Sequence, residues 1–256
     1  MRISTSILFL SLSLCVWAQN VGETVKAEKQ SINIFSFSAS YSYTLTGGDM
    51  AFYYGANSRI GGAFNFKNKT DWYFSLEGTY LFGSNLKDTT YGVFDGIKTS
   101  EGYVTSKFGT PADYALNLRG FTVMLKAGRI LSFAKINEQS GFLISAGAGF
   151  FQHHLRIDNN SNDTPQILDE YKKGYDHLHN GIALSQFAGY IYHANNKMLN
   201  VVVGFEITEG FTKNRRQYNY DTMQYDLAAK LDLMYSFKLG IIVPIARRTP
   251  SEFYIY

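Results

Sequence analysis

The chain has 256 residues and a formal net charge of +3, with 18% charged and 16% aromatic residues. Beyond its N-terminal region no apolar run approaches the ~18 residues of a membrane-spanning helix, which excludes a helical membrane protein. No basic cluster reaches the scale of a nucleic-acid-binding patch, so nucleic acid is not an expected partner.

The N-terminus predicts an export signal at residues 1–18. A positive charge and a short apolar core at residues 7–16 precede a small-residue cleavage site that ends at Ala18. Cys15 raises the alternative of a lipoprotein signal, but Leu14 stands where that signal needs a small residue. Because cleavage after Ala18 removes the only cysteine, the exported chain would have no disulfide and no thiolate metal site.

Residues 19–30 are polar and lack periodicity, which predicts a periplasmic lead-in. In the following stretch, SINIFSFSASYSYTL at residues 31–45, apolar and mostly aromatic residues alternate with serines. A period of two is typical of a strand with two different faces. The run exceeds the roughly 9–11 residues that a tilted strand needs to cross a bilayer. It predicts the first strand of a transmembrane β-barrel, with aromatics toward lipid and serines toward the lumen.

Seven more amphipathic segments follow, at residues 56–67, 71–83, 116–131, 141–155, 181–193, 198–211 and about 225–243. The connections after the odd-numbered segments are longer than those after the even-numbered ones, as in barrels with long extracellular loops and short periplasmic turns. The predicted fold is all-β: a closed, antiparallel, up-and-down, eight-stranded transmembrane β-barrel over residues 31–245, in a single domain. Gln186 interrupts the apolar face of its segment and leaves that register open.

The alternation also assigns side chains to the two faces. The residues expected outside include Phe35, Tyr41, Trp72, Phe74, Phe121, Leu125, Val201, Val203, Leu231 and Leu233. The charged residues expected in the lumen are Glu77, Lys126, Glu206, Lys230 and Asp232. An ion path and a buried catalytic dyad are two functional interpretations of this set. Because an eight-stranded barrel is filled by its own side chains and buried opposite charges should pair, we expect a charge-paired plug.

Four histidines are the candidate catalytic or metal-binding residues. His153 and His154 end the fifth predicted strand, and His177 and His179 precede the sixth. With a carboxylate or a hydroxyl nearby, histidine can bind zinc or act as a general base. The candidate partners are Ser185, Glu170 and Asp176. Since the HExxH, GxSxG and phosphate-loop patterns are absent, we predict no metal and no cofactor, and expect polar residues at the membrane surface.

Two outer loops invite a binding interpretation. Residues 159–163, NNSND, suggest calcium, but the spacing does not match an EF-hand loop and its closing glutamate is missing, so a solvated loop is expected. Arg215 and Arg216 in the last outer loop could bind the phosphates of anionic lipid headgroups. A solvated charged loop is the alternative for these two arginines.

The C-terminal residues 246–256 predict a periplasmic tail, because Pro244 cannot donate to a sheet ladder and the last strand should end near it. Its candidate docking residues are Arg247, Arg248, Phe253, Tyr254 and Tyr256. We expect a docking peptide whose aromatic residues anchor it and whose arginines steer it toward acidic surfaces. The alternatives are that the final tyrosine serves as a barrel-assembly signal and that the tail is a disordered end.

The signal, the eight amphipathic strands and the loop asymmetry resemble the small outer-membrane β-barrel proteins of Gram-negative bacteria, with an architecture similar to OmpA and OmpX. The abundant Tyr and Phe and the ending GIIVPIARRTPSEFYIY look like members from the Bacteroidota. The resemblance implies an outer-membrane location and contact with outer-membrane lipid and lipopolysaccharide. Two barrel enzyme families, the lipid A palmitoyltransferases and deacylases, use a histidine near the extracellular rim, but no motif of theirs matches here.

The sequence therefore predicts a non-enzymatic outer-membrane barrel, acting as a structural or accessory subunit of an outer-membrane complex through its long loops and its tail. One alternative is an enzyme that modifies outer-membrane lipid with a rim histidine. Another is a small pore or carrier of hydrophobic ligands. A lumen filled by side chains would argue against the pore. A histidine within hydrogen-bond reach of a serine and a carboxylate at the rim would favour the enzyme.

Overall fold

The computed structural model describes residues 33–131, 140–161, 163–193, 200–216 and 218–245. The predicted signal, the lead-in and the tail at residues 246–256 lie outside these described residues. Within the described ranges, no helix has the length and apolar character needed to cross a membrane.

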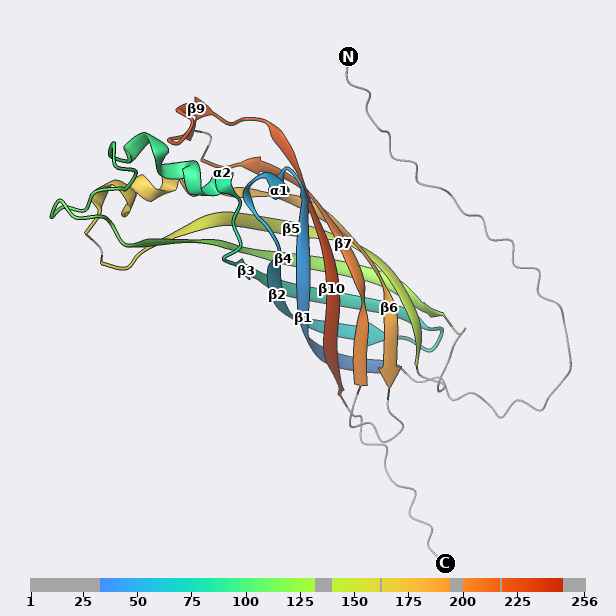
Figure 1. The fold of residues 1–256 in the computed structure, drawn as a ribbon. Helices are drawn as coiled ribbons and strands as arrows, with labels where there is room; N and C mark the ends of the chain where they lie inside the picture. The colour runs from blue at the N-terminus through green and yellow to red at the C-terminus, as the bar shows by residue number, and fades with distance from the viewer. Residues whose placement is uncertain (1–32, 132–139, 162, 194–199, 217, 246–256) are drawn as a thin grey trace, which may run out of the picture. The chain divides into compact units, whose positions relative to one another are not determined.

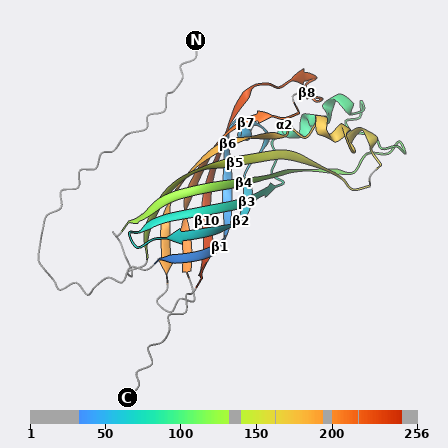
Figure 2. The ribbon, with the colours of Figure 1, turned by 180° about the vertical axis from the view of Figure 1, so that it is seen from behind.

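Eight long antiparallel strands form a closed barrel (Figures 1 and 2). They are β1 (Ile34–Gly48), β2 (Asn57–Lys67), β3 (Trp72–Gly83), β4 (Tyr114–Leu131), β5 (Gly141–Asn159), β6 (His179–His193), β7 (Asn200–Asn214) and β10 (Ala229–Pro244). Each strand pairs with its neighbour in this series, and β1 pairs with β10 to close the sheet. This topology confirms the predicted eight-stranded, up-and-down barrel.

The strand ends differ from the prediction where the long loops begin. We call this the loop end of the barrel, and the opposite end the turn end. At the loop end β5 continues to Asn159, β6 already starts at His179 and β7 continues to Asn214. The last long strand starts later than predicted, at Ala229, because residues 218–225 form a separate hairpin of β8 (Tyr218–Asn219) and β9 (Gln224–Tyr225). Apolar alternation could not locate these ends, because polar side chains occur on both faces there.

The two faces of the sheet differ as the alternation predicts. On β1, Ser36 and Ser42 are buried in the lumen, whereas Phe37, Tyr41 and Tyr43 are exposed on the outside. The same exterior face carries exposed apolar residues on the other strands, including Trp72, Phe74, Phe121, Leu125, Phe205, Leu231 and Phe237. A continuous apolar exterior around a polar interior is the surface of a membrane-spanning barrel.

Gln186, whose register the sequence leaves open, lies on the exterior of β6 in phase with its apolar neighbours Leu184 and Ala188. Its side-chain amide donates to Oε1 of Glu209 on β7 at 3.5 Å. The interruption of the apolar face is thus a polar pair on the outer wall and not a change of register.

The β2–β3 connection is the tight polar turn that the sequence predicts. The Asn68 side-chain oxygen accepts hydrogen bonds from the backbone N–H groups of Thr70 at 2.8 Å and Trp72 at 3.0 Å. Asp71 adopts the left-handed conformation, with φ 63°, and its carboxylate pairs with Lys67 at 2.8 Å. Local side-chain to backbone bonds of this kind favour turns over continued sheet.

The long loops fold over the loop end of the barrel and form a cap of short helices and turns. The helical elements are α1 (Met50–Tyr53), α2 (Asp88–Tyr91), η1 (Gly92–Ile97), η2 (Pro165–Ile167) and η3 (Tyr171–Gly174). Figure 1 shows α2 and the neighbouring short helices gathered at this end of the strands. The Phe94 side chain is 0% exposed and makes edge-to-face contacts with Tyr114 and Tyr175, with ring centroids 5.0 and 5.2 Å apart.

This cap shares one hydrophobic core with the part of the lumen nearest the loop end. Its buried members include Met50, Tyr54, Val93, Phe94, Val104 and Ile167 from the loops, and Leu118, Phe151, Leu155 and Met234 from the strands. The loops are therefore packed onto the barrel, which the polar composition of these segments did not predict.

Candidate functional site

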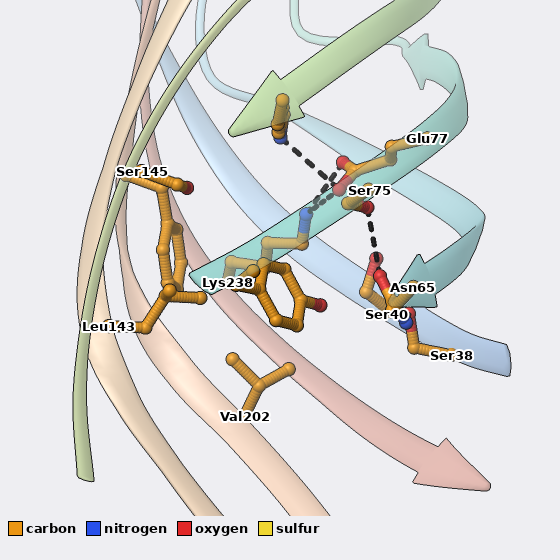
Figure 3. Close-up of a pocket in the computed structure, with 12 residues that line it drawn as sticks. Ser38, Ser40, Asn65, Ser75, Glu77, Leu143, Ser145, Val202 and Lys238 are labelled. Atoms are coloured by element: carbon orange, nitrogen blue, oxygen red, sulfur yellow. Dashed lines mark hydrogen bonds and ion pairs between the residues drawn. The ribbon is translucent and has the colours of Figure 1, made fainter. Parts of the chain in front are cut away.

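A network of five buried charges crosses the middle of the lumen. The Lys126 ammonium lies 2.5 Å from a Glu206 carboxylate oxygen and 3.2 Å from Glu77. Lys238 lies 2.5 Å from Glu77, and the Arg59 guanidinium lies 2.9 Å from Glu206. Three cations thus share two carboxylates, and Figure 3 shows Lys238 reaching Glu77 across the lumen. Such pairing offsets the cost of removing these charges from water.

Glycine makes room for this network. A Cβ added at Gly147 would lie 2.6 Å from Cγ of Lys126 on the neighbouring strand. Gly147 and Gly149 both lie on the lumen face of β5, where a narrow lumen favours small residues.

Two members of the network, Arg59 and Lys238, were not predicted. Lys238 is in phase with Asp232 and Ser236 on the inward face of β10, so strict alternation would have found it. Arg59 is in phase with Asn65 and Lys67 on the inward face of β2 and directly precedes the exposed Ile60, so the same alternation would have found it.

Two of the predicted lumen charges lie apart from the network. Lys230 and Lys238 are eight residues apart, which is roughly 26 Å along a strand. At the loop end Asp232 accepts hydrogen bonds from Thr212 Oγ1 at 2.6 Å and pairs with His153 Nε2 at 2.9 Å. Lys230, near the start of β10, pairs at 3.2 Å with Asp226, which precedes that strand. Because Asp226 also lies 3.8 Å from His179 Nε2, Lys230 and Asp232 both belong to one group beside the histidines. The single predicted set is therefore two groups.

The charge network lies between two groups of packed apolar side chains. On its loop side is the core shared with the cap, and toward the turn end is a second cluster. The second cluster consists of Ile130, Leu143, Phe187, Ile191, Val202 and Ile242. A cavity of about 30 Å³ lies beside the network and has room for about two waters. Figure 3 shows residues that line it, among them Ser38, Ser40 and Glu77. The lumen lined by the described residues is filled by side chains.

Three of the four candidate histidines come together beneath the loops. The rings of His153 and His179 stack with centroids 5.3 Å apart. His179 Nδ1 hydrogen-bonds to the His177 carbonyl at 2.7 Å, and His177 Nε2 hydrogen-bonds to Asp221 at 3.1 Å. His154, by contrast, lies on the outer face of β5, in phase with exposed Arg156.

Two tyrosines cover the histidine cluster from α1 and the residue after it. The Tyr53 ring lies 5.0 Å from the His177 ring, and the Tyr54 ring lies 5.8 Å from that of His153. Burial raises the pKa of both tyrosine hydroxyls above the ordinary value, which keeps them protonated. The histidine cluster is therefore bordered by one buried and one partly buried tyrosine and by the carboxylates of Asp221 and Asp232.

The histidine cluster lacks the geometry of a nucleophilic triad in the described residues. Thr212 donates its hydroxyl proton to the Asp232 carboxylate and not to the His153 ring. Ser185 lies six residues along β6 from His179, roughly 20 Å away. Among the described residues, no group of three histidines or acidic residues is placed to hold a metal ion.

The other candidate partners are also engaged elsewhere. Glu170 pairs with Lys173 at 2.5 Å. Asp176 accepts three hydrogen bonds from Arg216, from Nη2 to Oδ2 at 2.6 Å and from Nε to Oδ1 at 3.0 Å and to Oδ2 at 3.2 Å. These bonds raise the pKa of Arg216. Arg216 thus links two loops of the cap, while its neighbour Arg215 donates to the Asn180 side chain.

Known proteins resemble this chain in fold alone. No family model matches the sequence, and no curated protein has detectable sequence similarity to it. The Neisserial surface protein A structure is 13% identical with a TM-score of 0.43, and covers 82% of this chain and 96% of its own. Ail, the attachment invasion locus protein of Yersinia pestis, solved in complex with the heparin analogue sucrose octasulfate, is 10% identical with a TM-score of 0.40, covering 82% and 99%. The outer membrane protein OprG from Pseudomonas aeruginosa is 11% identical with a TM-score of 0.37, covering 83% and 96%.

The closed sheet, the apolar exterior and the charge-filled lumen together define the class of this protein. It is a small, eight-stranded, membrane-spanning β-barrel.

Proposed function

We propose that this chain is a non-enzymatic outer-membrane barrel that presents its loop cap outside the cell as a structural or accessory subunit of an outer-membrane complex. The observation that carries the proposal is the contrast between a filled interior and an aromatic outer surface. Antiparallel eight-stranded barrels with an apolar exterior are built for outer membranes. A charge network and two apolar clusters occupy the lumen lined by the described residues, which leaves no space there for a water-filled pore or a bound hydrophobic ligand. This argues against a pore and against a ligand carrier.

The cap carries the exposed aromatic residues that a docking surface needs. They come from all four long connections and include Phe52, Tyr91, Phe108, Tyr171 and Tyr225. Phe108 is 72% exposed at the tip of a hairpin that isolated bridges hold between Lys98 and Val104 and between Thr105 and Pro111. Aromatic residues are enriched in protein interfaces and dominate their binding energy.

The tail at residues 246–256 completes the proposal on the periplasmic side. Phe253 and Tyr254 would anchor it in a partner, and Arg247 would steer it toward acidic surfaces. Composition and the aromatic ending further suggest a source in the Bacteroidota.

The proposal is tested by co-purification from gently solubilised outer membranes. One variant carries Phe108→Ala with Tyr171→Ala, a second lacks residues 251–256, and Lys87→Ala serves as an exposed polar control in the cap. We expect each of the first two variants to lose a set of bound proteins while the barrel still inserts into the outer membrane. The same proteins bound to wild type and both variants would contradict the accessory role. Loss of insertion alone in the tail deletion would make Tyr256 an assembly signal.

A further inference from the structure

The outer wall of the barrel carries two adjoining hollows at the loop end of the β4–β5 hairpin. The first, of about 130 Å³, is lined in part by Tyr80, Arg119, Phe121 and Arg156. The second, of about 340 Å³, lies between β5 and η3 and is lined in part by Arg156 and Lys172. Arg156 and His154 line both hollows, which therefore lie side by side, and Asp158 and Asp176 also line the second. We call the two hollows together the cationic site.

Within the described part of the chain, two of the three cations of this site have no carboxylate partner, whereas the third, Arg156, forms an ion pair with Asp158. Among the described residues, Arg119 and Lys172 have no carboxylate within ion-pair distance, and Arg119 donates only to the Leu118 carbonyl at 2.8 Å. Arg156 uses its Nε on Asp158 at 2.7 Å, which leaves its terminal nitrogens without a partner in the described protein. The buried His154 Nδ1 also lacks a partner there. The one other acid in the lining, Asp176, is held by Arg216.

The site lies next to the lipid-facing aromatic surface, on the side of the loop end. Tyr80 pairs with Phe121, which pairs with Gln152, and Arg119 and His154 form the next exterior row toward the loops. Aromatic side chains at this position mark the boundary between hydrocarbon and headgroups. Arg119 and Arg156 are diagonal neighbours on paired strands, roughly 7–8 Å apart at the backbone, so both guanidinium groups can reach one anion.

We propose that this site binds the phosphate groups of a phosphorylated glycolipid of the outer leaflet. Arg119 and Arg156 would hold a phosphate through charge-assisted hydrogen bonds, and Phe121 would pack against the lipid below it. A lipid is favoured over a soluble anion because the hollows open on the barrel wall beside the lipid-facing aromatics. The inference rests on the proposed function in one respect, since such a lipid is encountered only in an outer membrane.

The test measures lipid A binding to the purified full chain in detergent micelles by native mass spectrometry. The double variant Arg119→Gln/Arg156→Gln should bind bisphosphorylated lipid A about 10-fold or more weakly, because it loses charged hydrogen bonds. Arg129→Gln is the matched control, since Arg129 is exposed on the same strand at the turn end. Wild type should likewise bind dephosphorylated lipid A more weakly, and millimolar inorganic phosphate should not displace the lipid.

Three outcomes would overturn the inference: wild-type affinity in the double variant, an equal loss in Arg129→Gln, or undiminished binding of dephosphorylated lipid A. Full displacement by inorganic phosphate would show a soluble-anion site and overturn the lipid assignment. Heat-dependent gel migration verifies that the barrel is folded, and Lys172→Gln, outside the sheet, replaces the double variant if that one does not fold. Because binding is measured on purified protein, failure here is distinct from failure to find the protein in outer membranes.

Discussion

At the scale of single residues, the lumen network explains how this barrel keeps five charges away from water. Glu206 is the central acid, because it contacts both Arg59 and Lys126, and Lys126 joins it to Glu77. Removing one carboxylate leaves buried cations with fewer partners than they need. This lowers the stability of the fold far more than replacing the whole ion pair by apolar residues does.

Replacing Glu206 by Gln should therefore destabilise the folded barrel by about 3–5 kcal/mol. The control is Thr208→Val on the same face of the same strand, where the buried hydroxyl has no partner among the described residues. That change should be nearly neutral, because no hydrogen bond is lost. Urea unfolding in lipid bilayers measures both free energies. Equal stability of the Glu206→Gln variant and wild type would contradict the network.

Single-residue chemistry was the least predictable part of the site. The sequence placed Glu77, Lys126 and Glu206 on the inward face, and the structure joins them. It also grouped Lys230 and Asp232 with them, because alternation gives the face of a residue but not its depth in the barrel. Arg59 and Lys238 were overlooked although the alternation of β2 and β10 puts both on the inward face. The histidine cluster depends on loop folding that no local pattern encodes.

At the scale of elements, each strand carries different side chains on its lipid-facing and lumen-facing sides. On β7, Phe205 is 67% exposed on the outer wall, while its neighbour Glu206 is buried inside. The whole barrel was predictable from this period of two, because lipid and lumen impose opposite polarity on successive residues.

Replacing Phe205 by Arg should destabilise the inserted barrel by about 2–4 kcal/mol if the residue lies near the bilayer midplane. Ser40→Ala, on the inward face of β1 beside the small cavity, should cost much less. Reversible folding into bilayers compares the two variants. Similar losses at both positions would contradict the assignment of the faces.

The loop cap is the element that the sequence did not reveal. Its core uses isolated apolar residues such as Phe94, Val104 and Ile167, which are scattered through polar segments and have no period. Their contacts join segments that are far apart in the chain. A local sequence pattern therefore predicts only a polar loop here.

Replacing the fully buried Phe94 by Ala should loosen the cap by about 3–5 kcal/mol while the barrel stays folded. Phe108→Ala, at the exposed tip of the same loop, is the matched control and should leave the cap intact. Hydrogen exchange over residues 84–115 reports the opening. Unchanged protection in the Phe94 variant would show that the cap does not depend on this core.

At the scale of the whole molecule, the described part of the lumen has a charged middle between two clusters of packed apolar side chains. A planar bilayer that contains the chain from residue 19 onward should therefore show no steady ion conductance. The expectation follows from the packed clusters on both sides of the charge network. A steady current that ceases when the protein is heat-denatured before insertion would contradict it.

The central claim is that the aromatic face of the barrel contacts lipid while the serine face lines a filled lumen. The exported chain is expected to have no cysteine, so a single spin label can be placed at each position along β1. Labels at residues 37, 39, 41 and 43 should be reached by oxygen dissolved in the bilayer but not by a water-soluble nickel chelate. Labels at Ser38 and Ser40 should be shielded from both. Nickel access at the odd positions, or shielding of all positions from both reagents, would contradict a membrane-spanning barrel.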